Sequence, residues 1–134
     1  MINLTGWLEI DALTSRGKSS HVATCRGELA LEKGHRMVRH VVLLSWNEKS
    51  DDEAVAAVTR GFADLPGQIP EIRAYTFGPD LQTDRRNSDY VLVADFDTEE
   101  DFQTYSNHPA HIDFMKKLTF PILSSFKAAQ FALS

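Results

Sequence analysis

Four strand-like segments separated by helical segments constrain the fold of this chain more than any other feature. The strand-like segments alternate in hydrophobicity or are rich in β-branched and aromatic residues, and they cover residues 38–46, 72–77, 89–96 and 125–133. Apolar side chains at helical spacing lie between the first and second segments and again between the third and fourth. The order from Met37 onward is therefore β-α-β-β-α-β.

This order is the split βαβ arrangement of ferredoxin-like α+β domains. It predicts a four-stranded antiparallel sheet with helices on one face only. Each predicted strand, however, carries apolar residues on both of its faces. An apolar sheet face that no helix covers favours a partner. We therefore expect a homodimer joined through the sheet faces, which is a dimeric α+β barrel.

Local signals set the predicted ends of the helices. Residues 50–53 (Ser-Asp-Asp-Glu) form a capping box that predicts the first helix start, and the Pro66–Gly67 pair predicts its end. Asp97–Thr98, with Glu100 close behind, predicts the start of the second helical region, and Pro121 predicts its end or a kink. The first helix turns a shared apolar face inward: Ala54, Val58, Gly61, Phe62 and Leu65.

The second helical region is interrupted by a turn rich in chemically useful side chains, Tyr105 to His111. Asn107 or His108 can end one helix and cap the next, and Pro109 suits the first turn of that next helix. His111 then lies in the first turn, where unpaired N–H groups make the potential positive and disfavour a cation. A neutral imidazole near pH 7 can act as a general base.

Each of these side chains also has a structural interpretation. His108 is expected to cap and pack rather than catalyse, and Tyr105 with Phe102, three residues apart, fits a helix face in the core. For His111 the local sequence leaves two alternatives, a pocket residue or a solvated histidine in the first turn.

Composition excludes several classes of function. The formal net charge of -5 and the pI of about 5.4 argue against nucleic-acid binding. Cys25 is the only cysteine, so no internal disulfide can form, which fits a reducing cytoplasm. No apolar run approaches the ~20 residues of a membrane-spanning helix, and we expect neither a membrane association nor a secretory signal.

Residues 1–36 differ from the rest of the chain and are interpreted as an extension outside the domain, which covers residues 37–134. They hold four of the seven glycines, with a weak strand at 7–13 and a weak helix at 23–33. Residues 12–19 match a relaxed P-loop pattern, but glycines interrupt the helix that should follow, so a nucleotide site is not favoured. Either the natural protein begins at Met37, or the extension covers the barrel mouth or the partner subunit.

Three segments resemble the Dabb family, the stress-responsive dimeric α+β barrel proteins: MVRHVVLLSW at 37–46, NSDYVLVADF at 87–96 and TYSNHPAHIDF at 104–114. A histidine on the first strand and a Tyr-x-x-His-Pro-x-His turn occur together and in the right order. Most members of this family have no assigned activity. Its best-understood relative is the plant olivetolic acid cyclase, a cofactor-free enzyme that closes a linear polyketide.

The resemblance implies a set of site residues. In the cyclase the second histidine of the turn is the base and the tyrosine six residues earlier helps to hold the substrate, positions that correspond to His111 and Tyr105 as the candidate catalytic pair. Candidate ligand-binding residues follow from the same resemblance and from the turn: His40, Tyr90, Phe62 and His108. Tyr90 and Phe62 depart from the cyclase, which has a histidine and a tyrosine there, so the same substrate is not implied.

Three functions remain open from the sequence. The first is a cofactor-free cyclase, isomerase or decarboxylase acting on a small apolar or aromatic carbonyl compound, with an apolar lining from Phe62, Leu92, Phe114, Met115 and Phe120. The second is a non-catalytic ligand-binding protein, and the third is a structural dimer module. A heme- or flavin-free monooxygenase is suggested by fold analogy alone. His108 and His111 with Asp113 give fewer good ligands than zinc normally takes, so neither a metal nor a cofactor is expected.

Overall fold

The computed structural model describes residues 36–133. Its elements in chain order are β1 (Val38–Trp46), α3 (Asp52–Gln68), β2 (Ile72–Pro79), β3 (Tyr90–Phe96), α4 (Glu99–Asn107), α5 (Pro109–Phe114), a π-helical turn (Met115–Thr119), a 3-10 turn (Phe120–Ile122) and β4 (Leu123–Ala132). The predicted β-α-β-β-α-β order is confirmed, with the second helix divided in two. The segments predicted at 7–13, 12–19 and 23–33 lie outside the described residues.

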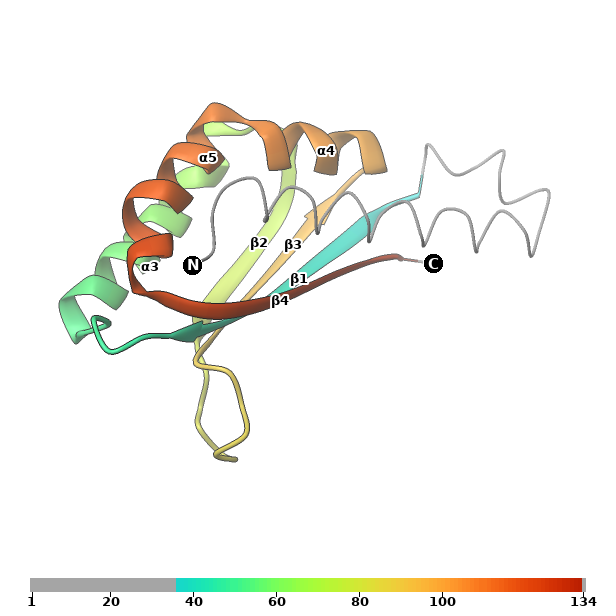
Figure 1. The fold of residues 1–134 in the computed structure, drawn as a ribbon. Coiled ribbons are helices and arrows are strands. Elements are labelled where there is room, and N and C mark those ends of the chain that lie inside the picture. Colours follow the sequence, from blue (N-terminus) through green and yellow to red (C-terminus); the bar gives the residue numbers. More distant parts are fainter. Residues whose placement is uncertain (1–35, 134) are drawn as a thin grey trace.

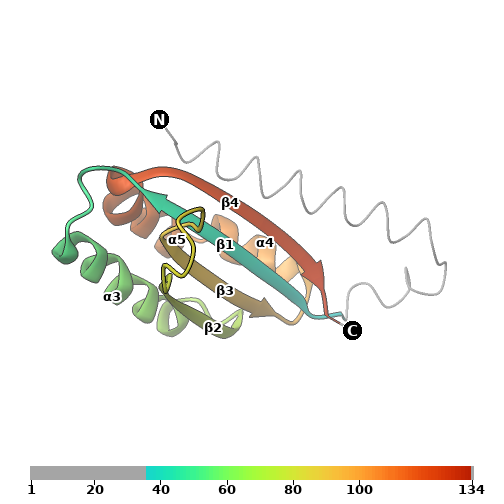
Figure 2. The ribbon, with the colours of Figure 1, turned by 90° about the horizontal axis from the view of Figure 1, so that it is seen from below.

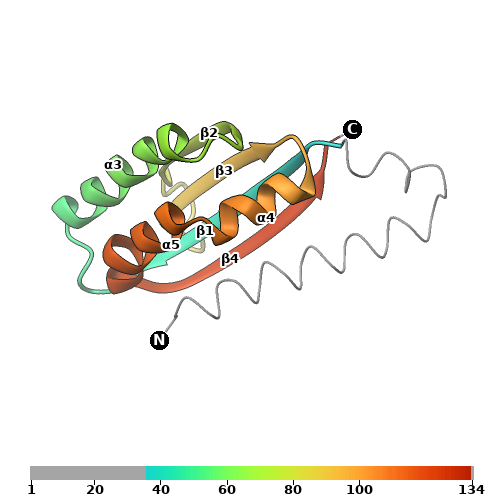
Figure 3. The ribbon, with the colours of Figure 1, turned by 90° about the horizontal axis from the view of Figure 1, so that it is seen from above.

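The four strands form one antiparallel sheet in the order β2-β3-β1-β4. Helices α3, α4 and α5 all lie over the same face of this sheet, as Figure 1 shows from the side and Figure 3 from above. In the view from below, no helix among the described residues covers the opposite face (Figure 2). The fold is the ferredoxin-like α+β sandwich that the order of elements predicts.

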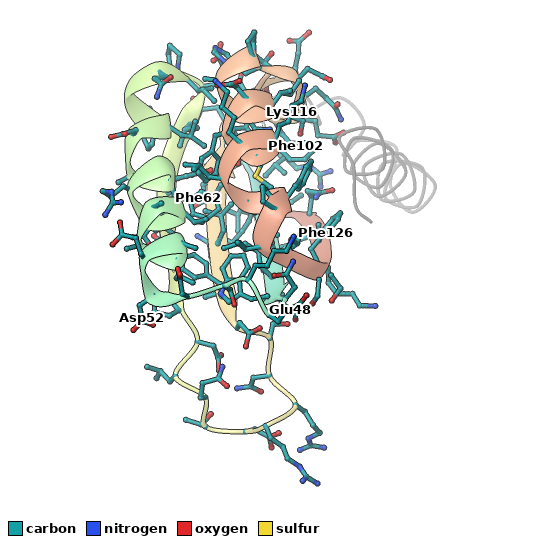
Figure 4. The ribbon with its side chains drawn as sticks, turned by 60° about the vertical axis from the view of Figure 1, so that its left-hand side comes forward. Glu48, Asp52, Phe62, Phe102, Lys116 and Phe126 are labelled. Atoms are coloured by element: carbon teal, nitrogen blue, oxygen red, sulfur yellow. The ribbon has the colours of Figure 1, made fainter. Side chains whose placement is uncertain are left out.

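The core lies between the helices and the covered face of the sheet. Alternation along the strands decides which side chains enter it, because successive residues point to opposite faces. Along β1 the buried residues are Val38, His40, Val42 and Leu44, and along α3 they are Val58, Phe62 and Leu65. The buried residues of α3 lie on the inner face that the sequence predicts for this helix. Figure 4 shows Phe62 between α3 and the helices opposite, while Asp52 lies at the outer start of α3.

The uncovered face is largely apolar along its two central strands. Val41 pairs with Val93 of β3 and with Ala129 of β4, and the side chain of Leu43 is 39% exposed. One ion pair interrupts this face: the Arg39 guanidinium donates two hydrogen bonds to the Asp95 carboxylate, at 2.7 and 2.9 Å. The prediction that both sheet faces are apolar therefore holds on the central strands.

Two predicted helix ends are wrong by a few residues. The cap of α3 is Asp51, whose carboxylate accepts a hydrogen bond from the Ala54 N–H at 2.8 Å, while the Ser50 hydroxyl donates to the carbonyl of Asn47. The positive end of the helix also stabilises a carboxylate, which explains why Asp51 rather than Ser50 is the cap. Pro66 does not end α3, which continues to Gln68.

The end of the second helical region also differs from the prediction. A regular helix would place Leu118 inward with Met115, but the π-helical turn that begins at Met115 changes the phase of the side chains. Leu118 is 38% exposed and Thr119 is buried in its place. Pro121 lies in a 3-10 turn, and β4 begins at Leu123, two residues earlier than predicted. At the start of this region, the Thr98 cap is confirmed, since its hydroxyl accepts from the Asp101 N–H.

Candidate functional site

The turn between α4 and α5 is fixed by His108. Its Nδ1 accepts a hydrogen bond from the Ala110 N–H at 3.0 Å, so the imidazole caps α5, and Pro109 occupies the first helical position. His108 has an extended backbone, with φ of -68° and ψ of 134°, which is favoured for a residue that precedes proline. The structure therefore gives His108 the capping role that the sequence favours over catalysis.

His111 lies inside the core, with a side chain that is 1% exposed. Its Nδ1 is 3.2 Å from the backbone carbonyl oxygen of Ser106. A carbonyl oxygen can only accept a hydrogen bond, so Nδ1 carries the proton, and Nε2 of the neutral ring carries the lone pair. Of the two alternatives left by the sequence, this burial excludes the solvated histidine.

Burial sets the charge of this imidazole. Removal from water lowers the pKa of His111 to about 4, the Ser106 carbonyl opposes this shift, and His108 nearby adds to it. The sequence attributes the neutral state to the positive end of α5, but this helix has six residues and desolvation is the largest cause. The predicted neutral state holds, and the predicted reason for it is wrong.

Tyr105 packs directly against His111, with ring centroids 4.4 Å apart. Its hydroxyl lies 2.6 Å from the hydroxyl of Tyr75 on β2, and either group can donate in this pair. Burial and the neighbouring tyrosines raise the pKa of Tyr75 well above its ordinary value. The Tyr75 phenol therefore stays protonated near neutral pH, and the pair supplies O–H groups rather than a phenolate.

His40 enters the same cluster from the sheet. Its ring centroid is 4.8 Å from that of Phe102 and 6.1 Å from that of Tyr105. Burial lowers the pKa of His40 to about 3, and His111 contributes to this shift. The two imidazoles therefore interact electrostatically. Three of the predicted site residues, one from a strand and two from helices, are thus brought together in the core.

Phe62 and Tyr90 lie beside this cluster rather than in it. The two rings stack with centroids 5.9 Å apart, and Phe62 also contacts Tyr75 at 6.1 Å. The Tyr90 hydroxyl is 2.7 Å from the hydroxyl of Thr59 on α3, so its polar end is bonded away from the histidines. The Phe62 ring therefore contacts both Tyr75, which belongs to the histidine cluster, and Tyr90, which lies outside it.

The apolar lining predicted from the sequence is buried with these groups. Leu92, Phe114 and Met115 belong to the core, and Phe120 is partly buried against it. His40, Tyr105 and His111 are each at most 1% exposed. A ligand that reaches the imidazoles therefore has to displace side chains that pack together in this structure.

Three contributors to the site were missed by the sequence analysis. Gln130 on β4 bonds to His40, Tyr75 bonds to Tyr105, and the Ser106 carbonyl bonds to His111. Gln130 gave a usable signal, since it is a polar residue on the same strand face as Phe126 and Ala128. A backbone carbonyl carries no signal in the sequence.

Metal binding has little support in the described part of the chain. Within residues 36–133, no three side chains of His, Cys, Asp or Glu gather in a way that could hold a metal ion. The cluster itself brings together imidazole rings, phenol hydroxyls and apolar side chains. None of the helices in this part of the chain has the length and apolar character needed to cross a membrane.

Residues 38–132 match the family model described as the stress-responsive A/B barrel domain, or Dabb. This chain belongs to the Dabb family. The stress-response A/B barrel domain-containing protein HS1 of Arabidopsis thaliana is 27% identical over 86 residues, which are 63% of this chain and 79% of that protein. The family named by the resemblance is thus confirmed.

Solved structures share the fold. A dimeric ferredoxin-like protein of unknown function from Thermobifida fusca is 37% identical, with a TM-score of 0.68 over 73% of this chain and 92% of that one. The hydroxynitrile lyase from Passiflora edulis is 19% identical, with a TM-score of 0.67 over 75% of this chain and 95% of that one. The first of these proteins is described as dimeric, and the second is a hydroxynitrile lyase.

Proposed function

We propose that this Dabb protein binds a small, largely apolar carbonyl compound in its buried cluster and acts on it by general-base catalysis without a cofactor. His111 is the base and Tyr105 the hydrogen-bond donor. The observation that carries the proposal is the tautomer of His111, because the bond from Nδ1–H to the Ser106 carbonyl leaves the lone pair on Nε2. A buried, neutral imidazole with a fixed lone pair has the state that a base requires.

The proposed reaction begins with proton transfer. His111 Nε2 takes a proton from the carbon next to the carbonyl group, and the electrons of the C–H bond move to the carbonyl oxygen. Tyr105 stands against the His111 ring and can donate its O–H to this developing oxyanion. The enolate carbon then attacks a second carbonyl group of the substrate and closes a ring, or the protonated His111 returns the proton to another carbon and gives an isomer.

The apolar surroundings suit this chemistry. Phe62, Phe114 and Met115 exclude water from the imidazole, and electrostatic contacts are stronger where water is absent. The hydroxynitrile lyase of the same fold supports the idea that this architecture can hold an active site. Because the cluster is closed, substrate entry requires local opening of the helices above the sheet.

The test is turnover in matched histidine variants. General-base catalysis contributes typically ~10²–10⁴-fold, so His111→Ala should lower the turnover of a phenolic carbonyl substrate by about this factor. His108→Asn is the control: it removes the neighbouring imidazole, keeps an N-cap side chain and should retain most of the activity. Turnover that is unchanged in a folded His111→Ala protein contradicts the proposal.

A second candidate is a non-catalytic ligand-binding protein or a structural dimer module. The observation that favours it is the nearly complete burial of His40, Tyr105 and His111 among packed side chains. Saturable binding without product indicates a binding protein. A structural module is indicated if His111→Ala loses stability and the wild-type protein binds no carbonyl compound.

We also propose that the chain forms a homodimer through its uncovered sheet face. Val41, Val93 and Ala129 form an apolar centre on this face, and the 37% identical protein from Thermobifida fusca is described as dimeric. An apolar face of this kind is stabilised by a second copy of itself. We also propose a cytoplasmic location, because a chain with a single cysteine fits a reducing compartment.

A further inference from the structure

His40 is the buried polar group that the general-base proposal leaves unexplained. Its side chain is completely buried, and its Nε2 has no hydrogen-bond partner among the described residues. A buried nitrogen without a partner is costly, so native proteins keep one for a reason such as a ligand. His40 and His111 both contact the ring of Tyr105, which places this nitrogen in the proposed site.

The partner of the other ring nitrogen defines the chemistry of His40. Gln130 lies opposite His40 in the β1–β4 pairing, and its amide nitrogen is 2.8 Å from His40 Nδ1. An amide nitrogen only donates, so Nδ1 accepts the hydrogen bond. In the neutral ring the proton then lies on Nε2, and the group without a partner is an N–H donor.

The two imidazoles of the site consequently have opposite tautomers. The Ser106 carbonyl accepts from Nδ1 of His111 and leaves a lone pair on its Nε2, whereas Gln130 donates to Nδ1 of His40 and leaves a proton on its Nε2. Burial keeps both rings uncharged, because it lowers both pKa values below the ordinary value for histidine. One buried cluster thus holds a base and a neutral hydrogen-bond donor.

We propose that Gln130 is a positioning residue that holds His40 as a neutral donor, and that His40 Nε2–H binds the carbonyl oxygen of the ligand. This inference rests on the proposed function for the role of His111. As His111 takes the proton from carbon, negative charge develops on the carbonyl oxygen, and His40 and Tyr105 both donate to it. The ligand class is therefore a carbonyl compound with a C–H next to the carbonyl group.

The first arm of the test is ring ¹⁵N NMR of the full chain at pH 7. Wild-type His40 should show its proton on Nε2, and His111, read in the same spectrum, should show its proton on Nδ1. In Gln130→Glu the carboxylate can only accept, so the His40 proton should move to Nδ1 while His111 stays unchanged as an internal control. If this variant does not fold, Gln130→Met, which has no donor, should lower the fraction of His40 with the proton on Nε2.

The outcomes of this arm separate the two proposals. A wild-type His40 with its proton on Nδ1 overturns the role of Gln130 and leaves the general-base proposal standing. A wild-type His111 with its proton on Nε2 overturns the general-base proposal and leaves the tautomer of His40 standing. Neither result depends on measuring activity.

The second arm tests the ligand with 4-hydroxyacetophenone and with 4-ethylphenol, which has a similar shape but lacks the carbonyl group. The wild-type protein should bind the ketone at least about tenfold more tightly, and the Nε2–H signal of His40 should shift on binding, as expected for a hydrogen bond to a developing or partial negative charge. Gln130→Glu or Gln130→Met should lose this preference. Equal affinity for the two compounds, or no measurable binding of the ketone, overturns the assignment of a carbonyl oxygen to His40.

Discussion

The two core histidines show how single residues couple this fold to pH. Each imidazole is neutral because charging it inside the core is unfavourable, and each has an Nδ1 partner that decides where its remaining proton lies. If the same histidines were exposed to water, their pKa values would lie near the ordinary value for histidine. Packing, rather than residue type alone, creates the proposed base and donor.

Stability should fall as the solution becomes mildly acidic. The folded-state pKa values of about 4 for His111 and about 3 for His40 lie below the ordinary value of 6.5, so the unfolded chain takes up protons first as pH falls. Their contribution is fully present above about pH 6.5, and each histidine should cost about 2 kcal/mol of unfolding free energy by about pH 5. Urea unfolding between about pH 5 and 6.5 measures this loss, since carboxylates remain largely ionised there.

The comparison variant for this prediction is His111→Gln. It removes one buried titrating group, so its unfolding free energy should depend less steeply on pH across the same range. Parallel pH profiles for the wild-type protein and the variant would show that His111 does not titrate with a lowered pKa.

At the residue scale, the sequence pointed to side chains that the fold brings together in the core, but it did not indicate their hydrogen-bond partners. Tyr105 and His111 were identified from a turn and a resemblance, and the cap at His108 from local chemistry. The bond from His111 to the Ser106 carbonyl depends on the angle between two helices, which no local pattern encodes. The Tyr75–Tyr105 contact joins a strand to a helix 30 residues away and depends on the assembled fold.

Among the elements, the approach of α3 to α5 depends on one glycine. A Cβ placed on Gly61 would lie 2.1 Å from Cε1 of the Phe114 ring, which packs edge-on against Phe62 with centroids 4.8 Å apart. The ring occupies the space that any larger residue at position 61 would need. This contact sets how closely the helix that follows the His-Pro-Ala-His turn can lie against the first helix.

Gly61→Ala should therefore destabilise the protein by about 1–3 kcal/mol, the usual cost of overpacking a core. Gly67→Ala is the matched control, since it lies in the same helix with nothing within 4 Å of its added Cβ, and it should be neutral or stabilising by up to ~1 kcal/mol. Thermal or urea unfolding of both variants checks the difference. Equal stability of the two alanine variants would mean that Phe114 moves aside freely.

Elements were predicted well where their signals are local and less well where tertiary packing decides. Alternation identified the strands, and the cap at Thr98 was predicted. Asp51, rather than Ser50, caps α3 because either side chain satisfies the local pattern and the carboxylate has the favourable charge. The π-helical turn at Met115–Thr119, which turns Leu118 outward, has no signal in the periodicity.

Within residues 36–133, the sheet has two apolar faces, one covered by the helices and one that none of the described helices covers. Figure 2 shows the uncovered face of the sheet. In the register of its central strands, Val41 pairs with Val93 and Leu43 pairs with Val91. In the proposed homodimer, this face packs against the same face of the second copy. The Arg39–Asp95 ion pair belongs to the face that is buried in this way. The sequence predicted the need for a partner from the apolar residues on both faces.

Leu43→Lys should convert the proposed dimer into a monomer. Under twofold symmetry the substitution introduces two lysines into one interface, and each buried charge is unfavourable. Leu81→Lys is the control, because Leu81 is 88% exposed in the loop that joins β2 to β3. Sedimentation equilibrium should give a monomer for the first variant and a dimer for the second and for the wild type; a monomeric wild-type protein would contradict the proposed assembly.

The central claim is that His111 is a buried, neutral imidazole that meets a carbonyl ligand. NMR titration of its ring, with and without 4-hydroxyacetophenone, tests this claim most directly. His111 should titrate with a pKa well below the ordinary 6.5, and its ring signals should move saturably as the ketone is added. A ring that titrates near 6.5 and ignores the ketone would contradict this claim, and the His-Pro-Ala-His turn would then be a structural joint between two helices.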